Sequence, residues 1–176
     1  VYQIAKIIRT CEKENIENAF NCTFPAITDR GMACSALTSL MVHYTGKSYY
    51  CHRLLYPKYE IFDFNKEQVD LRKFHLLNTA WHHSNSATCM KCPIRRVCSG
   101  QCQGAIDEYW EGAIGTPIPS VCHYYLLKYY ALSKISRVWD LQQYVDYEVL
   151  GKVVDSIYGP DVCANIERRL TEDGLL

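Results

Sequence analysis

The sequence predicts an α+β fold in which a small β-hairpin and cysteine-rich loops are combined with several helices and a helical C-terminal extension. Three observations lead to this prediction. Strand-forming residues flank a glycine turn within residues 37–51, five of the ten cysteines fall between residues 89 and 122, and apolar residues recur at helical spacing toward both ends. With 176 residues, of which 48% are hydrophobic, the chain can bury a core without covalent cross-links.

The opening segment is expected to form a helix. Ile4, Ile7 and Ile8 lie at helical spacing in the stretch that runs up to about Cys22. Such a helix would either end a preceding domain or act as a simple cap on the fold.

A β-hairpin is expected next. Residues 37–44 are rich in strand formers, Gly46 can make the tight reversal, and residues 48–51 would form the returning strand. The residues after it, 66–80, predict a helix that leads to the cysteine-rich stretch.

The C-terminal part is expected to be helical. Ser120 is a candidate N-cap for a first helix, and a second is expected over residues 138–157. The dipeptide at 159–160 is Gly-Pro, which would end that helix, and Asp161 could cap a last one. Cys163 would lie on this last helix as a buried thiol of the core.

Seven of the ten cysteines belong to two ordered patterns. Thiolates at such close spacing converge on one small volume, which is typical of a metal or cluster site. The patterns are Cys34-x11-Gly46-x4-Cys51 and Cys89-x2-Cys92-x5-Cys98-x3-Cys102-x19-Cys122.

A disulfide-linked secreted scaffold is the first competing interpretation of these cysteines. No signal-like apolar run opens the sequence, and the chain is large enough to fold without cross-links. Cysteines two residues apart also suit a shared metal better than they suit disulfides between distant segments. We therefore expect reduced thiols and a cytoplasmic location.

The spacing favours an iron–sulfur cluster over zinc, although it leaves zinc open. Structural zinc takes four ligands, usually from two knuckles, and Cys89-x2-Cys92 is one such knuckle. Its partner would be Cys98-x3-Cys102, which follows after an unusually short loop. Iron–sulfur clusters use cysteine almost exclusively and accept additional ligands from distant segments.

The order of the seven cysteines, with Gly46 between the first two, resembles the SPASM domain. This domain lies at the C-terminal end of many radical S-adenosylmethionine enzymes. The similarity covers about half of the chain, from Cys34 to Cys122. It implies two auxiliary four-iron, four-sulfur clusters and a role in the maturation of peptides or proteins.

The resemblance also implies two interleaved ligand sets, each of which would hold remote segments together. The first set has only three matched cysteines. Its fourth ligand would be Cys22, or its fourth iron position would stay open to substrate or water. The implied ligands are Cys34, Cys51 and Cys102 for the first cluster, and Cys89, Cys92, Cys98 and Cys122 for the second.

The catalytic motif of the same enzymes, Cys-x3-Cys-x2-Cys, is missing from the sequence. Cys98-x3-Cys102 supplies its first two positions, but Ala105 occupies the third. S-adenosylmethionine is therefore expected to bind only in a catalytic domain of the same longer chain, and this part should not be catalytic alone. The expected organisation is the end of a barrel-like domain or a capping helix (1–33), a SPASM-like domain (34–122) and a helical extension (123–176).

The expected function is electron transfer from a substrate radical, or positioning of the peptide or protein substrate. A zinc-binding interaction module and a remnant that only binds a leader peptide are the alternatives. Nineteen basic and nineteen acidic residues balance without long runs of either sign, so neither a nucleic-acid partner nor an anionic membrane surface is indicated. No stretch is apolar for long enough to span a bilayer.

Overall fold

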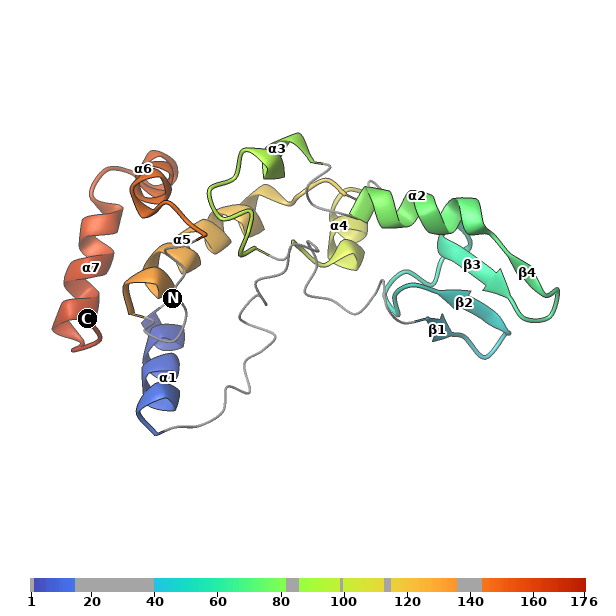
Figure 1. Ribbon diagram of the computed structural model, residues 1–176, viewed down its shortest axis with the longest axis horizontal. Coiled ribbons are helices and arrows are strands. Elements are labelled where there is room, and N and C mark those ends of the chain that lie inside the picture. Colours follow the sequence, from blue (N-terminus) through green and yellow to red (C-terminus); the bar gives the residue numbers. More distant parts are fainter. Residues whose placement is uncertain (1, 15–39, 82–85, 99, 113–114, 136–143) are drawn as a thin grey trace. The chain divides into compact units, whose positions relative to one another are not determined.

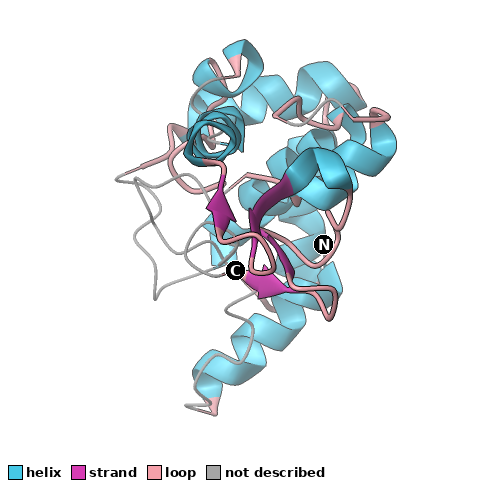
Figure 2. Ribbon diagram, turned by 90° about the vertical axis from the view of Figure 1, so that its right-hand side faces the viewer, coloured by secondary structure: helices cyan, strands magenta, loops and turns pink. Residues whose placement is uncertain are grey.

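The α+β prediction is confirmed: the described residues hold both helices and an antiparallel sheet (Figures 1 and 2). The computed structural model describes residues 2–14, 40–81, 86–98, 100–112, 115–135 and 144–176, without the side chains of Glu12 and Trp81. By their contacts the residues group into two compact units. The first is Val1–Asp29, Lys91–Cys98 and Pro119–Leu176, and the second is Arg30–Met90 and Ser99–Ile118.

The second unit contains a four-stranded sheet in the order β1-β2-β3-β4, with every neighbouring pair antiparallel. The predicted hairpin is confirmed as β1 and β2, whose strands are shorter than expected, and residues 37–39 of the expected first strand lie outside the described residues. Its turn residue Gly46 has a φ of 79°, a backbone conformation that favours glycine, and it lies close to the end of the Asn65 side chain. The strands are β1 (Met41–Val42), β2 (Lys47–Tyr49), β3 (Glu60–Asp63) and β4 (Gln68–Val69).

Helix α2 (Leu71–Trp81) packs against β3 in this unit. It begins later than the expected 66–80 because residues 68–69 pair with β3 instead. Asp70 then starts the helix, since its side chain accepts a hydrogen bond from the Lys73 backbone amide at 2.8 Å. The buried core of the unit comprises Tyr49, Tyr50, Cys51, Leu54, Tyr59, Ile61 and Leu77.

The first unit is helical, and α5 is its central element, with α1, α6 and α7 all packed against it. A long apolar run explains this position, because α5 buries side chains around much of its circumference. The helices, visible in Figure 1, are α1 (Tyr2–Lys13), α5 (Pro119–Ile135), α6 (Tyr147–Tyr158) and α7 (Val162–Glu172).

The expected opening helix is present as α1, which ends at Lys13; the part expected up to Cys22 lies outside the described residues. Its inward face is formed by Ala5 and Ile8, whereas Ile7 is 42% exposed. The apolar spacing therefore identified the helix but included one residue of the solvent face.

Two expected helix starts in the C-terminal part are wrong. The first helix begins at Pro119, one residue before the expected cap Ser120. The second was expected from residue 138, but residues 144–146 are not helical and 138–143 lie outside the described residues. Asp146 caps α6 instead, because its side chain accepts hydrogen bonds from the two amides at the start of the helix at 3.0 and 3.1 Å.

The break before the last helix is confirmed, since α6 ends at Tyr158 and α7 starts at Val162. Asp161 occupies the cap position, but its side chain makes no capping bond. Asp155 of α6 does so, accepting from the Cys163 amide at 2.9 Å. Cys163 is buried in the core as expected, and burial, its main influence, raises the pKa of the thiol to about 11.

Among the described residues, none of the helices combines the length and the apolar character needed to cross a membrane.

Candidate metal centre

The structure places six of the seven patterned cysteines. Cys34, together with the possible ligand Cys22, lies outside the described residues. All cysteines in the described part of the chain are free thiols, which is the form that metal ligation requires. The six patterned cysteines divide between the units: the first unit holds Cys92, Cys98 and Cys122, and the second holds Cys51, Cys89 and Cys102.

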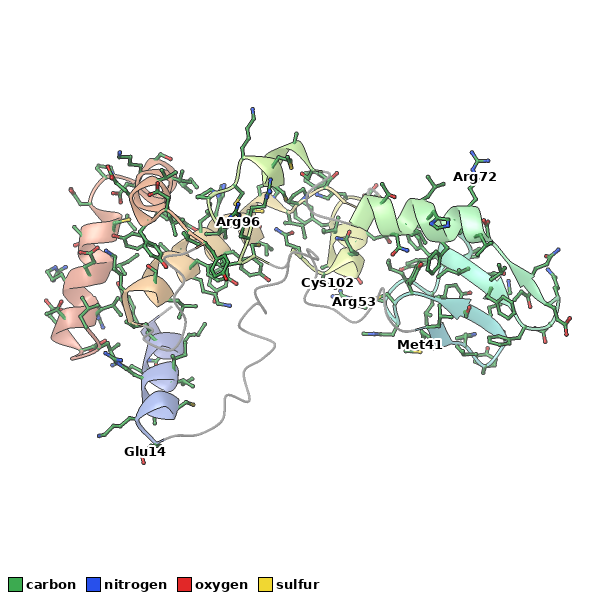
Figure 3. All side chains as sticks on the ribbon, viewed as in Figure 1. Glu14, Met41, Arg53, Arg72, Arg96 and Cys102 are labelled. Atoms are coloured by element: carbon green, nitrogen blue, oxygen red, sulfur yellow. The ribbon has the colours of Figure 1, made fainter. Side chains whose placement is uncertain are left out.

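Arg53 contacts both described thiols of the first implied ligand set. Its backbone amide donates a weak hydrogen bond to Cys51 Sγ at 3.5 Å. Its guanidinium donates to Cys102 Sγ at 3.8 Å, and the two labelled side chains lie side by side in Figure 3. Two thiols that are remote in the sequence are thus gathered around one arginine.

Arg53 packs against α4 (Gln103–Tyr109), for which Cys102 is the N-cap residue. Glu108 accepts a hydrogen bond from the guanidinium at 2.5 Å. Gly104 makes the close approach possible, because a Cβ at this position would lie 2.6 Å from the Arg53 Cβ.

A buried carboxylate anchors α4 and therefore also positions Cys102. Asp107 accepts hydrogen bonds from Lys58 Nζ at 2.8 Å and from the Tyr59 hydroxyl, both on the short helix η2 (Pro57–Tyr59). Burial alone would raise the pKa of Asp107, but these hydrogen bonds and the charge of Lys58 outweigh it, so the net pKa is lowered. The carboxylate is therefore ionised and paired at neutral pH.

In the first unit, the loop from Cys92 to Cys98 is docked on α5. Ile94 and Val97 are buried in the core, and the loop turns back on itself through a hydrogen bond from the Cys98 amide to the Ile94 carbonyl at 2.8 Å. Tyr129 of α5 donates its hydroxyl to the Val97 carbonyl at 2.9 Å. This bond fixes the loop against the helix and satisfies a buried carbonyl.

Cys122 lies on the same face of α5 as Tyr129, because residues seven positions apart are almost two full turns apart. Cys92 and Cys98 are half-buried and pack against the core of this unit. Three of the four cysteines of the second implied set therefore belong to one loop and the helix on which it is docked.

The remaining cysteine of that set, Cys89, lies on the short helix α3 (Ala87–Met90) of the second unit. Burial raises the pKa of its thiol, and a hydrogen bond with Ser86 partly offsets this effect.

Lys128 is buried on α5, a feature that sequence reasoning missed. Only 6% of the residue is exposed, and its ammonium lies 5.7 Å from the ring centroids of both Tyr125 and Tyr129. Burial lowers the pKa of Lys128, and the negative charge of the Cys98 thiolate opposes this shift. The signal in the sequence was a single charged residue within the otherwise apolar and aromatic run 124–132.

In the part of the chain that the structure describes, no group of three or more ligating side chains lies close enough together to hold a metal ion. In their chemistry the described donors suit an iron–sulfur cluster, because they are free thiols and one of them, Cys102, accepts a hydrogen bond from the Arg53 guanidinium. Arg96 of the Cys92–Cys98 loop is exposed and labelled in Figure 3.

Comparison of the chain with models of known protein families, with curated proteins and with solved structures finds no match. The resemblance to the SPASM domain therefore rests on the order and spacing of the cysteines alone.

Proposed function

We propose that this chain is the auxiliary-cluster portion of a radical S-adenosylmethionine enzyme that modifies a peptide or protein in the cytoplasm. It would bind two four-iron, four-sulfur clusters through the interleaved cysteine sets. The clusters would supply one-electron chemistry, accepting an electron from a substrate radical, and an open iron position would allow the substrate to be bound directly.

One structural observation supports this proposal most strongly. Cys51 and Cys102, which the resemblance assigns to the same cluster, both contact Arg53. The contact with Cys51 is made by the backbone amide of Arg53, whereas the guanidinium beside Cys102 would offset part of the negative charge that thiolate ligands bring to a cluster.

The residues of the chain would have separate tasks in this function. The patterned cysteines hold the clusters, Arg53 orients and stabilises the first set, and Asp107 keeps Cys102 in place through its bonds to η2. S-adenosylmethionine would be bound and cleaved in the catalytic domain of the same longer chain.

The first experiment is anaerobic reconstitution with iron and sulfide, followed by assays of iron, sulfide and zinc in the same sample. The proposal predicts about eight iron and eight sulfide per chain. The matched control is Cys163→Ala, which removes a buried cysteine outside both patterns and should leave the iron content unchanged. One zinc and little iron would refute the proposal and favour a structural interaction module.

A further inference from the structure

The two edges of the four-stranded sheet differ in their residues. Among the described residues the strand order makes β1 one edge and β4 the other (Figure 1). Natural sheets protect their edges from pairing with other chains by placing charged residues or proline there. The β4 edge is protected in this way, because the exposed residues Lys66, Glu67 and Asp70 flank the strand.

The β1 edge has no such protection. Residues 40–45 contain no proline and no lysine, arginine, aspartate or glutamate. The apolar and aromatic side chains of Leu40, Met41, Val42 and Tyr44 are nevertheless 41–92% exposed. A row of exposed apolar residues along an unprotected edge is typical of a surface that another chain covers.

The backbone of Val42 faces outward from this edge. Val42 lies opposite Ser48, and the next residue, His43, donates its amide to the Lys47 carbonyl at 2.8 Å. Hydrogen-bonded and non-hydrogen-bonded pairs alternate along an antiparallel ladder, so Val42 and Ser48 form a non-hydrogen-bonded pair. The amide and the carbonyl of Val42 therefore both point away from β2, where none of the described residues bonds to them.

We propose that the outer edge of β1 docks an extended segment of the substrate as an added strand. This inference rests on the proposed function, which requires a peptide or protein substrate. An antiparallel segment would exchange two hydrogen bonds with Val42, and apolar side chains at its alternate positions would pack against Leu40 and Val42. The substrate is therefore one that can become extended and carries apolar residues two positions apart.

A second copy of this chain is a less suitable occupant of the edge. A stable dimer buries about 1,200–2,000 Å² in total. Pairing of two β1 strands would bury far less, because the strand comprises only Met41–Val42. A short edge suits a substrate, which must bind weakly enough to leave after it has been modified.

The test is a binding titration with a fluorescent heptapeptide in which valine and threonine alternate between terminal lysines. Its anisotropy is measured while the reconstituted chain is added. Val42→Pro removes the outward amide but no hydrogen bond of the hairpin, and proline is tolerated on edge strands. This variant should bind the probe roughly tenfold more weakly than wild type.

Val69→Pro is the matched control. Val42 and Val69 lie in the same row across the sheet, through Ser48 and Phe62, but on opposite edges. The control therefore makes the same substitution at the charged edge and should bind the probe like wild type. Equal weakening in the two variants would overturn the proposal.

A second probe keeps the side chains but carries methyl groups on its internal amides, so it cannot donate hydrogen bonds to the edge. It should not bind wild type detectably. This probe decides the matter if Val42→Pro fails to fold, because equal affinity of the two probes for wild type would overturn the proposal. A wild-type chain that sediments as a dimer, with Val42→Pro a monomer, would also overturn it, since a second copy would then occupy the edge.

An iron assay on the same samples separates this inference from the proposed function. A chain that takes up about eight iron but does not bind the first probe would refute the inference alone. A chain that binds the probe as expected but takes up no iron would refute the proposed function and leave the edge as a peptide-binding site.

Discussion

Removal of the Tyr129 hydroxyl should loosen the Cys92–Cys98 loop from α5. The hydroxyl donates to the Val97 carbonyl at 2.9 Å, and both residues are buried. In Tyr129→Phe the ring still fills its place in the core, but the carbonyl loses this donor in a region that water does not reach.

The neighbouring Tyr130→Phe is a matched control. It deletes the same atom from the same helix, and the partner of its hydroxyl, Glu167, keeps an ion pair with Lys134 at 2.8 Å. A buried carbonyl left without its partner costs about 1–3 kcal/mol, whereas the loss of an ordinary hydrogen bond costs about 0.5–1.5 kcal/mol. Tyr129→Phe should therefore lower the free energy of unfolding by more than Tyr130→Phe.

Urea unfolding of the reduced, metal-free chain, followed by circular dichroism, measures the difference. Iron analysis after reconstitution gives a second readout, because a loosened loop should lower the occupancy of the second cluster in Tyr129→Phe and leave it intact in Tyr130→Phe. Equal stability and equal iron content in the two variants would refute the assignment of Tyr129 as the residue that positions the loop.

Two further predictions concern the ligand sets and the anchor of α4. Cys98→Ala should lose the second cluster and Cys102→Ala the first, so each variant should keep about half of the iron. The spectrum of the cluster that remains should differ between the two variants. Loss of all iron in both would mean that the two clusters form one cooperative unit. Because the pKa of Asp107 is lowered from 3.8, the stability it contributes is present above that pH and lost as the pH falls further. Unfolding midpoints from about pH 6 down to about pH 2 should fall less steeply for Asp107→Asn, and parallel curves would contradict the role of its pairing with Lys58.

Local signals in the sequence were sufficient for the hairpin and for the break before α7. Gly46 and the strand formers on either side of it determine a turn without help from distant residues. The strands β3 and β4 were missed because they are short and their pairing, such as Phe62 with Val69, depends on the tertiary fold. The same pairing explains why the helix expected from residue 66 starts only at Leu71.

Long-range contacts account for what the sequence did not reveal about the candidate site. The cysteine spacing predicted the ligand sets, but it contained no sign that Arg53 would lie beside Cys102, because this contact depends on the packing of Gly104. The side chain that caps α7 also differs from the expected Asp161. Asp155 of α6 accepts the hydrogen bond instead, because α6 and α7 pack together.

The most direct test of the central claim is Mössbauer spectroscopy of the chain after anaerobic reconstitution with isotopically enriched iron. The account predicts that about eight iron atoms per chain give only the signals of four-iron clusters. Iron that is bound singly, or in two-iron clusters, would contradict the assignment of the seven cysteines to two four-iron sites.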